Sequence, residues 1–120
     1  MTTALKYLEH KGKRILYIDF RNKNGDQNVE TLDEVAREMQ TWKQKGLTLS
    51  DFRNSTGSSA YMARIKKLGI EVFIPMTMRN AAIGLTGLQK VLLNAFNSFC
   101  KTDARAFDTE EEAKEWLVKD

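Results

Sequence analysis

The sequence is poor in several residues on which common protein chemistries depend. Its 120 residues include one cysteine, one histidine and one proline. A lone cysteine, Cys100, cannot form an intramolecular disulfide, and one cysteine with one histidine cannot build the usual Cys/His zinc site within one subunit. Cys100 stands in the stretch LLNAFNSFC, so we interpret it as a small apolar residue near a helix end rather than a reactive thiol. We expect no bound metal and no cofactor.

Long apolar runs are also lacking. No stretch approaches the roughly 20 apolar residues that span a bilayer, so we expect no transmembrane segment. The first residues, MTTALKYLEHKGKR, lack the apolar core of a signal peptide. A cytoplasmic location is therefore the expectation.

A strong charge of one sign is missing as well. The net charge is +3, and basic residues are spread among acids. Pairs such as Lys43 with Lys45 and Lys66 with Lys67 stand near predicted helix ends, where cations favour the helix dipole. Nucleic-acid binders usually gather such residues on one face, so we expect no nucleic-acid partner. With 42% hydrophobic and 29% charged residues, the composition is that of one folded domain over residues 1–120.

The N-terminal half predicts a hairpin followed by a helix and a strand. Ala4–Glu9 and Arg14–Phe20 are strand-like runs, and the second is apolar on both faces, as in a strand covered on both sides. The polar segment 22–28 predicts a turn. The apolar periodicity after it predicts a helix that starts at the capping-box pattern of Thr31–Glu34 and stops at Gly46. Leu47–Phe52 is the next predicted strand.

The middle of the chain leaves one alternative open. A helix is predicted from about Ser58, after the polar loop Arg53–Ser59. If Gly69 ends it, Ile70–Met76 is a strand or an extended crossing; otherwise Gly69 lies inside a longer helix that includes Ile70–Met76. Pro75 stops either version.

The C-terminal part predicts two further strand–helix units. Asn80–Leu85 is a buried strand, and Thr86–Gln89 opens a helix with a capping-box pattern. The apolar residues of that helix cover more than half of its circumference, which predicts a well-buried helix. Ala104–Phe107 is a short strand, and a last helix starts at Asp108 and Thr109. The order β-β-α-β-α-β-α-β-α predicts an α/β fold with a mixed, mostly parallel sheet, and we find no internal repeat, low-complexity tract or interdomain linker.

Ligands of open α/β sheets favour the carboxyl ends of the strands, which here are Asp51–Ser59, Gly84–Gly87 and Asp108–Thr109. Hydroxyls before a helix cap it, bind an anion or accept a regulatory phosphate. Ser55 and Ser58 are candidates both for capping and for phosphorylation, and the sequence does not decide which serine would be the acceptor. The candidate residues for ligand or partner binding are Asp51, Arg53, Asn54, Thr56, Gly57, Thr86 and Gly87.

Known catalytic and nucleotide-binding patterns are not found. Gly84–Gly87 can hold a phosphate at a helix start, but it lacks GxGxxG and GxxxxGK[ST], and a tight turn with a cap also explains it. His10 stands in a polar turn with no nucleophile assignable beside it. We therefore expect no catalytic residues and no enzyme activity.

The last third of the chain, AAIGLTGLQKVLLNAFNSFCKTDARAFDTEEEAKEWLVKD, carries a family resemblance. It resembles bacterial STAS-like proteins related to the sporulation anti-anti-sigma factor. In that group a strand ending in Gly leads into an apolar helix, and a strand with Phe-Asp-Thr leads into a helix of the EEA-x-x-WL kind. The N-terminal half is similar in its order of elements, with the run Asp51–Asn54 closing the third strand. The matching positions here are Gly84, Leu88, Phe107, Asp108, Thr109, Ala113, Trp116 and Leu117.

The resemblance implies a mixed sheet backed by helices, a fold sometimes compared with lipid-binding CRAL-TRIO domains, and no established enzyme activity. It also implies a signalling domain that binds a protein partner and is switched by phosphorylation of a Ser in a D-S-x-G-like loop. Residues 53–58 read RNSTGS and lack the acid–Ser–x–Gly order, which indicates a divergent member. We therefore expect a regulatory, protein-interaction domain with a candidate phosphorylation loop at Ser55–Ser59.

Two further expectations concern binding and assembly. The alternative function is binding of a small apolar or lipid-like molecule in a pocket near Tyr61, Phe73 and Phe96. A homodimer is expected if the first hairpin leaves an unpaired strand edge.

Overall fold

A five-stranded sheet forms the centre of the computed structural model, which describes residues 4–100 and 102–119, apart from the side chains of residues 99 and 100. The strands lie in the order of the sequence. β1 and β2 are antiparallel, and every later neighbour is parallel, so the predicted mixed, mostly parallel sheet is confirmed. The strands are β1 (Leu5–His10), β2 (Lys13–Asp19), β3 (Gly46–Asp51), β4 (Thr77–Ile83) and β5 (Arg105–Phe107).

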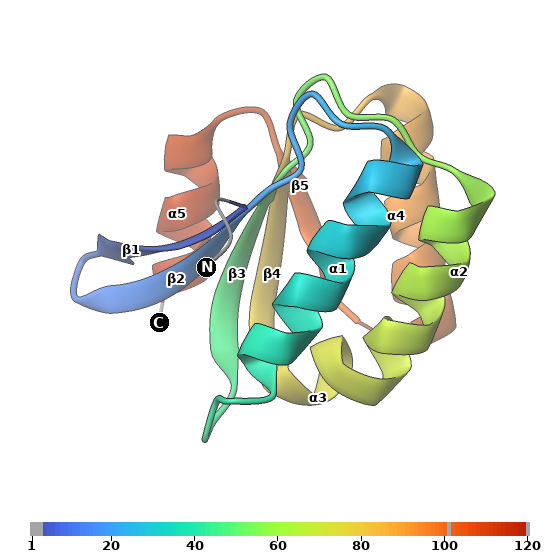
Figure 1. Cartoon of the computed structure of the whole chain (residues 1–120). Coiled ribbons are helices and arrows are strands. Elements are labelled where there is room, and N and C mark those ends of the chain that lie inside the picture. Colours follow the sequence, from blue (N-terminus) through green and yellow to red (C-terminus); the bar gives the residue numbers. More distant parts are fainter. Residues whose placement is uncertain (1–3, 101, 120) are drawn as a thin grey trace.

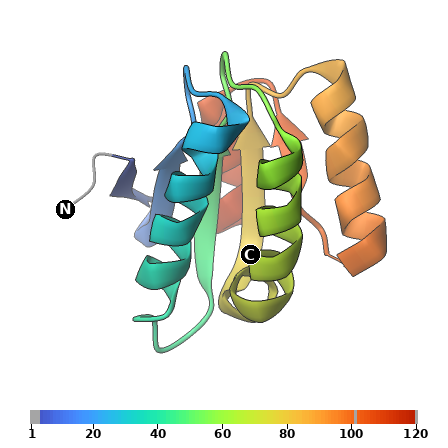
Figure 2. The same ribbon diagram turned by 45° about the vertical axis from the view of Figure 1, so that its right-hand side comes forward.

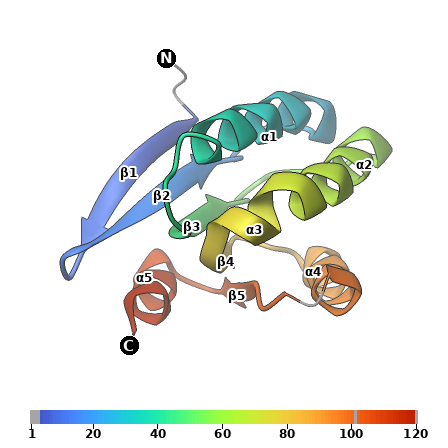
Figure 3. The ribbon, with the colours of Figure 1, turned by 90° about the horizontal axis from the view of Figure 1, so that it is seen from below.

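Helices cover both faces of the sheet, as Figure 1 shows. On one face, α5 packs on alternate residues of the central strands, among them Ile15, Leu49 and Ala81. The other face carries Leu16, Ile18 and Phe20, which pack against α1 and the segment after α2. Figure 3 separates α5 from α1 and α2 across the sheet. The helical segments are α1 (Gly25–Met39), α2 (Ser59–Leu68), η1 (Gly69–Phe73), α3 (Ile74–Met76), α4 (Gly87–Cys100) and α5 (Glu110–Val118).

Helix α1 begins and ends earlier than predicted. Its capping box is formed by Asn24 and Gln27, each of which accepts a hydrogen bond from the other's backbone N–H at 2.9 Å. Thr31 is instead buried inside the helix, where its hydroxyl accepts a hydrogen bond from Nζ of Lys23 at 3.5 Å and caps nothing. The helix ends at Met39, and Gly46 begins β3. Two patterns in the sequence fit a capping box, and the local pattern alone does not rank them.

The segment Ile70–Met76 is helical, so the strand alternative is wrong. Gly69 adopts helical backbone angles, and α2 continues through it into η1 and α3. Within η1 the chain forms a wider π-type turn, in which the N–H of Ile74 reaches the carbonyl of Gly69. Pro75 lies in α3, the three-residue segment that ends this helical run. β4 begins directly afterwards, at Thr77.

Helix α4 starts as predicted but is not well buried. Thr86 and Gln89 form the expected capping box, with hydrogen bonds of 2.9 and 3.2 Å. Over residues 87–98, however, no side chain of α4 is fully buried, and Leu88 is 71% exposed. Figure 2 shows α1, α2 and α4 running side by side along the sheet, with α4 at the end of the row. Its apolar circumference therefore faces more solvent than protein.

Candidate functional site

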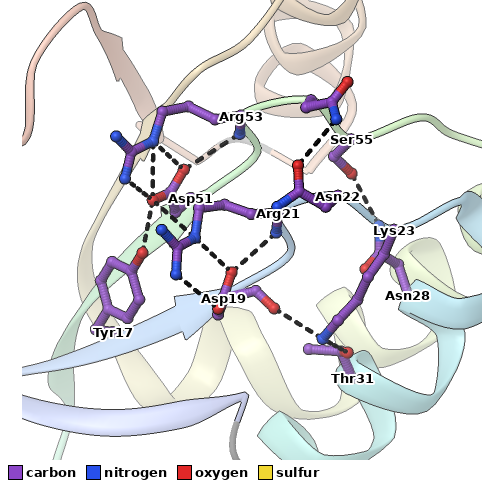
Figure 4. Close-up of polar contacts among 11 residues, drawn as sticks. Tyr17, Asp19, Arg21, Asn22, Lys23, Asn28, Thr31, Asp51, Arg53 and Ser55 are labelled. Carbon is purple, nitrogen blue, oxygen red and sulfur yellow. Dashed lines mark hydrogen bonds and ion pairs between the residues drawn. The ribbon is translucent and has the colours of Figure 1, made fainter.

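The same four residues, Asp-Phe-Arg-Asn, end two neighbouring parallel strands. They occur at 19–22 after β2 and at 51–54 after β3, and Asp19 pairs in register with Asp51. The expectation of no internal repeat is therefore wrong at this short scale. Figure 4 shows the two copies side by side at the carboxyl edge of the sheet. We call them the first and the second DFRN segment.

Each arginine folds back onto the aspartate of its own segment. Arg21 donates to Asp19 Oδ1 from its backbone N–H and from Nε, both at 2.9 Å, and from Nη2 to Oδ2 at 3.1 Å. Arg53 repeats the arrangement on Asp51, with its backbone N–H and Nε at 3.1 and 3.0 Å from Oδ1 and Nη2 at 2.6 Å from Oδ2. The repeated sequence thus gives a repeated side-chain geometry.

Contacts between the segments join them into one unit. The rings of Phe20 and Phe52 stack with centroids 4.6 Å apart. The amide of Asn54 donates to the side-chain oxygen of Asn22 at 2.8 Å, and both asparagines have positive φ. Asparagine tolerates that backbone region better than most residues, which explains its place in both loops.

The electrostatics of the second segment centre on a buried carboxylate. Burial by itself raises the pKa of Asp51, but hydrogen bonds from Arg53 and Tyr17 outweigh it and hold that pKa below its usual value. Tyr17 donates to Asp51 Oδ2 at 2.5 Å, and burial together with this bond raises the pKa of the phenol to about 12. In the first segment, the hydrogen bond from Arg21 lowers the pKa of Asp19. Both carboxyls are therefore ionised near neutral pH, and Tyr17 is neutral.

The two serines that were candidates for phosphorylation have different surroundings. Ser55 is buried; its hydroxyl accepts from the amide of Asn28 at 2.9 Å, and its carbonyl accepts from Gln89 at 3.0 Å. Ser58 is the N-cap of α2 and accepts from the N–H of Tyr61 at 3.1 Å. It packs against Gly25, where an added Cβ would overlap Ser58. The starts of α1 and α2 therefore meet at Ser58.

The structure brings the predicted loops together. Gly84 has φ +79, and an added Cβ would lie 2.5 Å from the backbone nitrogen of Arg53. Gln89 ties the start of α4, with Thr86 and Gly87, to Ser55. Arg53, Asn54, Thr56 and Gly57 are exposed in this region. Oδ1 of Asp108 instead lies 3.9 Å from Nζ of Lys90. The first DFRN segment was missed, although the repeated tetrapeptide is visible in the sequence.

A cavity of about 620 Å³ lies on the face of the sheet that carries α1, α2 and α4. Tyr61, Phe73 and Phe96, the three aromatic residues predicted to line a pocket, all line it. Its floor on the sheet is partly polar, with Thr48 donating to Asn80 at 2.9 Å and Ser50 alongside. Leu92 and Leu93 of α4 form part of its wall, and Ser55 and Gln89 also line it.

A known structure shows the same fold. It is that of an uncharacterized protein of the DUF3478 family from Shewanella loihica PV-4, described as having a SpoIIAA-like fold. The TM-score is 0.77 over 96% of this chain and 93% of that chain, at 19% sequence identity. The chain has a SpoIIAA-like fold. This confirms the fold that the STAS-like resemblance implied, and at this identity the likeness concerns fold alone. No family model and no curated protein matches the sequence.

Among residues 4–100 and 102–119, no three His, Cys, Asp or Glu side chains gather as a metal site would require. His10 lies at the hairpin turn, 3.6 Å from Glu115. Cys100 ends α4, and its side chain is outside the described part. Within that part, none of the helices combines the length and apolarity needed to span a membrane.

Proposed function

We propose that this SpoIIAA-like domain is a non-enzymatic binding domain that holds a small apolar or lipid-like molecule in the cavity between α2 and α4. The observation that carries the proposal is the cavity itself. Its volume of about 620 Å³ falls within the range of roughly 300–1,000 Å³ that is typical of small-molecule sites. The aromatic residues that line it include Tyr61, Phe73 and Phe96, from three different segments, as the alternative function predicts.

The lining supports an occupant that is mostly apolar with a polar group. Tyr61, Ile65, Phe73, Leu93 and Phe96 provide apolar walls, while Thr48, Ser50 and Asn80 place hydroxyl and amide groups on the floor. Ligand pockets commonly combine apolar walls with a few polar groups that fix orientation. On the opposite face of the sheet, the hydrophobic core residues on β2, β3 and β4 are Ile15, Tyr17, Leu47, Leu49, Ala81 and Ile83.

The charged groups at the strand ends support a role without catalysis. Asp19 and Asp51 each accept several hydrogen bonds from an arginine, and the pKa of Tyr17 is raised to about 12. A general acid or base needs a pKa near the working pH, and these shifts move the pKa of both carboxyls and of the phenol away from neutrality.

The test is ligand binding by a cavity-filling variant and its matched control. Leu93→Trp places a large side chain into the cavity wall, whereas Leu88→Trp adds the same side chain to the same helix at a position that is exposed and outside the lining. We expect wild type and Leu88→Trp to bind 1-dodecanol saturably in ¹⁵N NMR titrations, and Leu93→Trp to bind at least tenfold more weakly.

Native mass spectrometry of the protein purified from its own cells complements this test, because a co-purified molecule would identify the ligand. The proposal fails if dodecanol shifts no resonance of the cavity residues, or if both tryptophan variants bind as the wild type does.

A second candidate function is regulation of a protein partner through the Ser55–Ser59 loop, with phosphorylation as the switch. The contact between Ser58 and Gly25 favours Ser58 as the acceptor, because a phosphate on its hydroxyl would lie where the starts of α1 and α2 meet. Phosphorylation would also replace the cap of α2. Ser55 is the less favoured acceptor, since its hydroxyl is buried against Asn28.

Phosphopeptide mass spectrometry on the native protein tests this switch, together with affinity purification of wild type and Ser58→Glu. We expect modification at Ser58 and a partner that distinguishes the two forms. The absence of phosphate at either serine under all growth conditions would remove the switch. Light scattering would decide whether the open edge of β1 supports the expected homodimer.

A further inference from the structure

The two DFRN arginines direct their positive charge outward. The side chains of Arg21 and Arg53 are 43% and 56% exposed, whereas those of Asp19 and Asp51 are 25% and 0% exposed. Each carboxylate is thus covered by the guanidinium that it binds. An ion pair arranged in this way is nearly neutral in total, but it presents its cationic side to solvent.

Part of each guanidinium is left outside the ion pair. A guanidinium has five N–H groups, and the bonds to the carboxylate use those of Nε and one of Nη2. The Nη1 group of each arginine is therefore outside this pairing. Planar guanidinium groups with free N–H donors match the oxygens of phosphate and carboxylate.

The two guanidinium groups lie next to each other, as Figure 4 shows. Oδ2 of Asp51 is 2.6 Å from Nη2 of Arg53 and 3.8 Å from Nε of Arg21, so both arginines reach one oxygen. Tyr17 donates to the same oxygen, and Nζ of Lys6 lies 4.9 Å from the centre of its ring. Two arginines are therefore paired with two carboxylates, of which one is fully buried, and Lys6 lies beside the ring of Tyr17.

We propose that Arg21 and Arg53 together bind the phosphate group of a ligand at the carboxyl edge of β2 and β3. A phosphate has enough oxygens to accept from both guanidinium groups at once, whereas a single carboxylate is satisfied by one fork. Phe20 and Phe52 of the two segments line the cavity, but the paired charged residues Asp19, Arg21, Asp51 and Arg53 do not, so the phosphate would bind outside it. This site does not depend on the proposed ligand of the cavity.

A third arginine provides a matched control. Arg105 also binds the aspartate two positions earlier, with Nε and Nη2 both 3.2 Å from the oxygens of Asp103. Its side chain is 54% exposed, like Arg53, but Asp103 is 70% exposed. Arg105 therefore makes the same local pair with an aspartate, but its carboxylate is exposed and it is not part of a DFRN segment.

The experiment is a ¹⁵N NMR titration of the full chain with inorganic phosphate, against sodium chloride at equal ionic strength. We expect saturable shifts at the amides of Arg21, Asn22, Arg53 and Asn54. Arg21→Gln and Arg53→Gln should each weaken phosphate binding at least tenfold, and Arg105→Gln should leave phosphate binding unchanged. Arg53→Lys keeps the charge but loses the fork; it should keep the fold and still bind more weakly than wild type.

Spectra of residues far from this edge show whether each variant is folded. Should Arg53→Gln not fold, Arg21→Gln and Arg53→Lys carry the test. The proposal is overturned if phosphate and chloride give the same shifts, if the shifts do not saturate, or if folded Arg21→Gln binds as tightly as wild type.

Vesicle sedimentation then distinguishes two sources of the phosphate. Binding to phosphatidylcholine vesicles only when they contain phosphatidic acid, with loss in Arg21→Gln, assigns the site to a lipid headgroup. Saturable phosphate binding without sedimentation assigns it to a soluble phosphate compound. Dodecanol binding in the cavity should be the same in wild type and Arg21→Gln, which separates a failure here from a failure of the proposed function.

Discussion

The two DFRN segments have one sequence and two environments. Asp19 and Asp51 occupy the same position, bind their arginines in the same way and pair in register. Yet Asp51 is fully buried and accepts from Tyr17, while Asp19 is partly exposed. The difference comes from position in the sheet. β3 is the central strand of the five, whereas β2 lies next to the edge strand β1. The same aspartate–arginine pair therefore has a buried carboxylate in one segment and a partly exposed one in the other.

Removing the carboxylate of each segment gives the largest expected contrast. Asp51→Ala leaves a guanidinium and a buried phenol without their acceptor, and we expect a loss of about 3–5 kcal/mol in unfolding free energy. Asp19→Ala removes a more exposed pair, so solvent screening limits the loss to about 1 kcal/mol. Urea unfolding of both variants measures this, and equal losses would show that burial of Asp51 adds nothing.

Tyr17→Phe removes the hydroxyl that donates a hydrogen bond to Asp51 of the second segment. We expect a loss of about 1.5–3 kcal/mol, typical of a hydrogen bond to a charged group. Tyr7→Phe is the matched control, because Tyr7 also donates to a carboxylate, that of Glu38, but is an exposed residue. Its loss should stay within about 0.5 kcal/mol. A small loss at Tyr17 would mean that the arginines alone stabilise the Asp51 carboxylate.

Gly84→Ala tests the close approach that only the second segment makes. The substitution is strained at φ +79 and crowds the backbone of Arg53, so we expect a loss of about 1–3 kcal/mol by thermal or urea unfolding. Gly12→Ala has nearly the same φ, +80, but open space around the added Cβ. It should lose less, and an equal loss in both would show that crowding of Arg53 is unimportant.

The smallest expected effect is on the acid dependence of stability. The folded-state pKa values of Asp19 and Asp51 are below their ordinary ones, so the stability that these groups contribute is present above the unfolded pKa of about 3.9. It is lost as the pH falls through the folded pKa. Urea unfolding from neutral pH down to about pH 2 should therefore show a shallower decline for Asp51→Asn than for wild type. An unchanged slope would contradict the lowered pKa of Asp51.

The sequence predicted the strands and helix starts well where a local signal was strong. The capping positions Ser58, Thr86 and Thr109 are N-caps or capping-box residues in the structure. The mixed parallel sheet followed from the alternation of elements. The start of α1 was missed because Asn24 and Thr31 stand in competing local patterns. The burial of α4 was overestimated, since an apolar helix surface does not reveal whether anything covers it.

The candidate site was predicted only in part, for a related reason. Arg53 and Asn54 were identified as loop residues at a strand end, and Tyr61, Phe73 and Phe96 as pocket residues. Arg21 and Tyr17 were not, because their relation to Asp51 exists only once β2 and β3 lie side by side.

What the sequence by itself determined is local: which residues cap a helix, which alternate in a strand, and which tetrapeptide occurs twice. These depend on backbone geometry and on neighbours within a few positions. The tertiary structure decided which aspartate is buried, which helix face is left uncovered, and that a cavity lies beside α4. Burial and long-range pairing depend on the packing of segments far apart in the chain, and no local pattern records them.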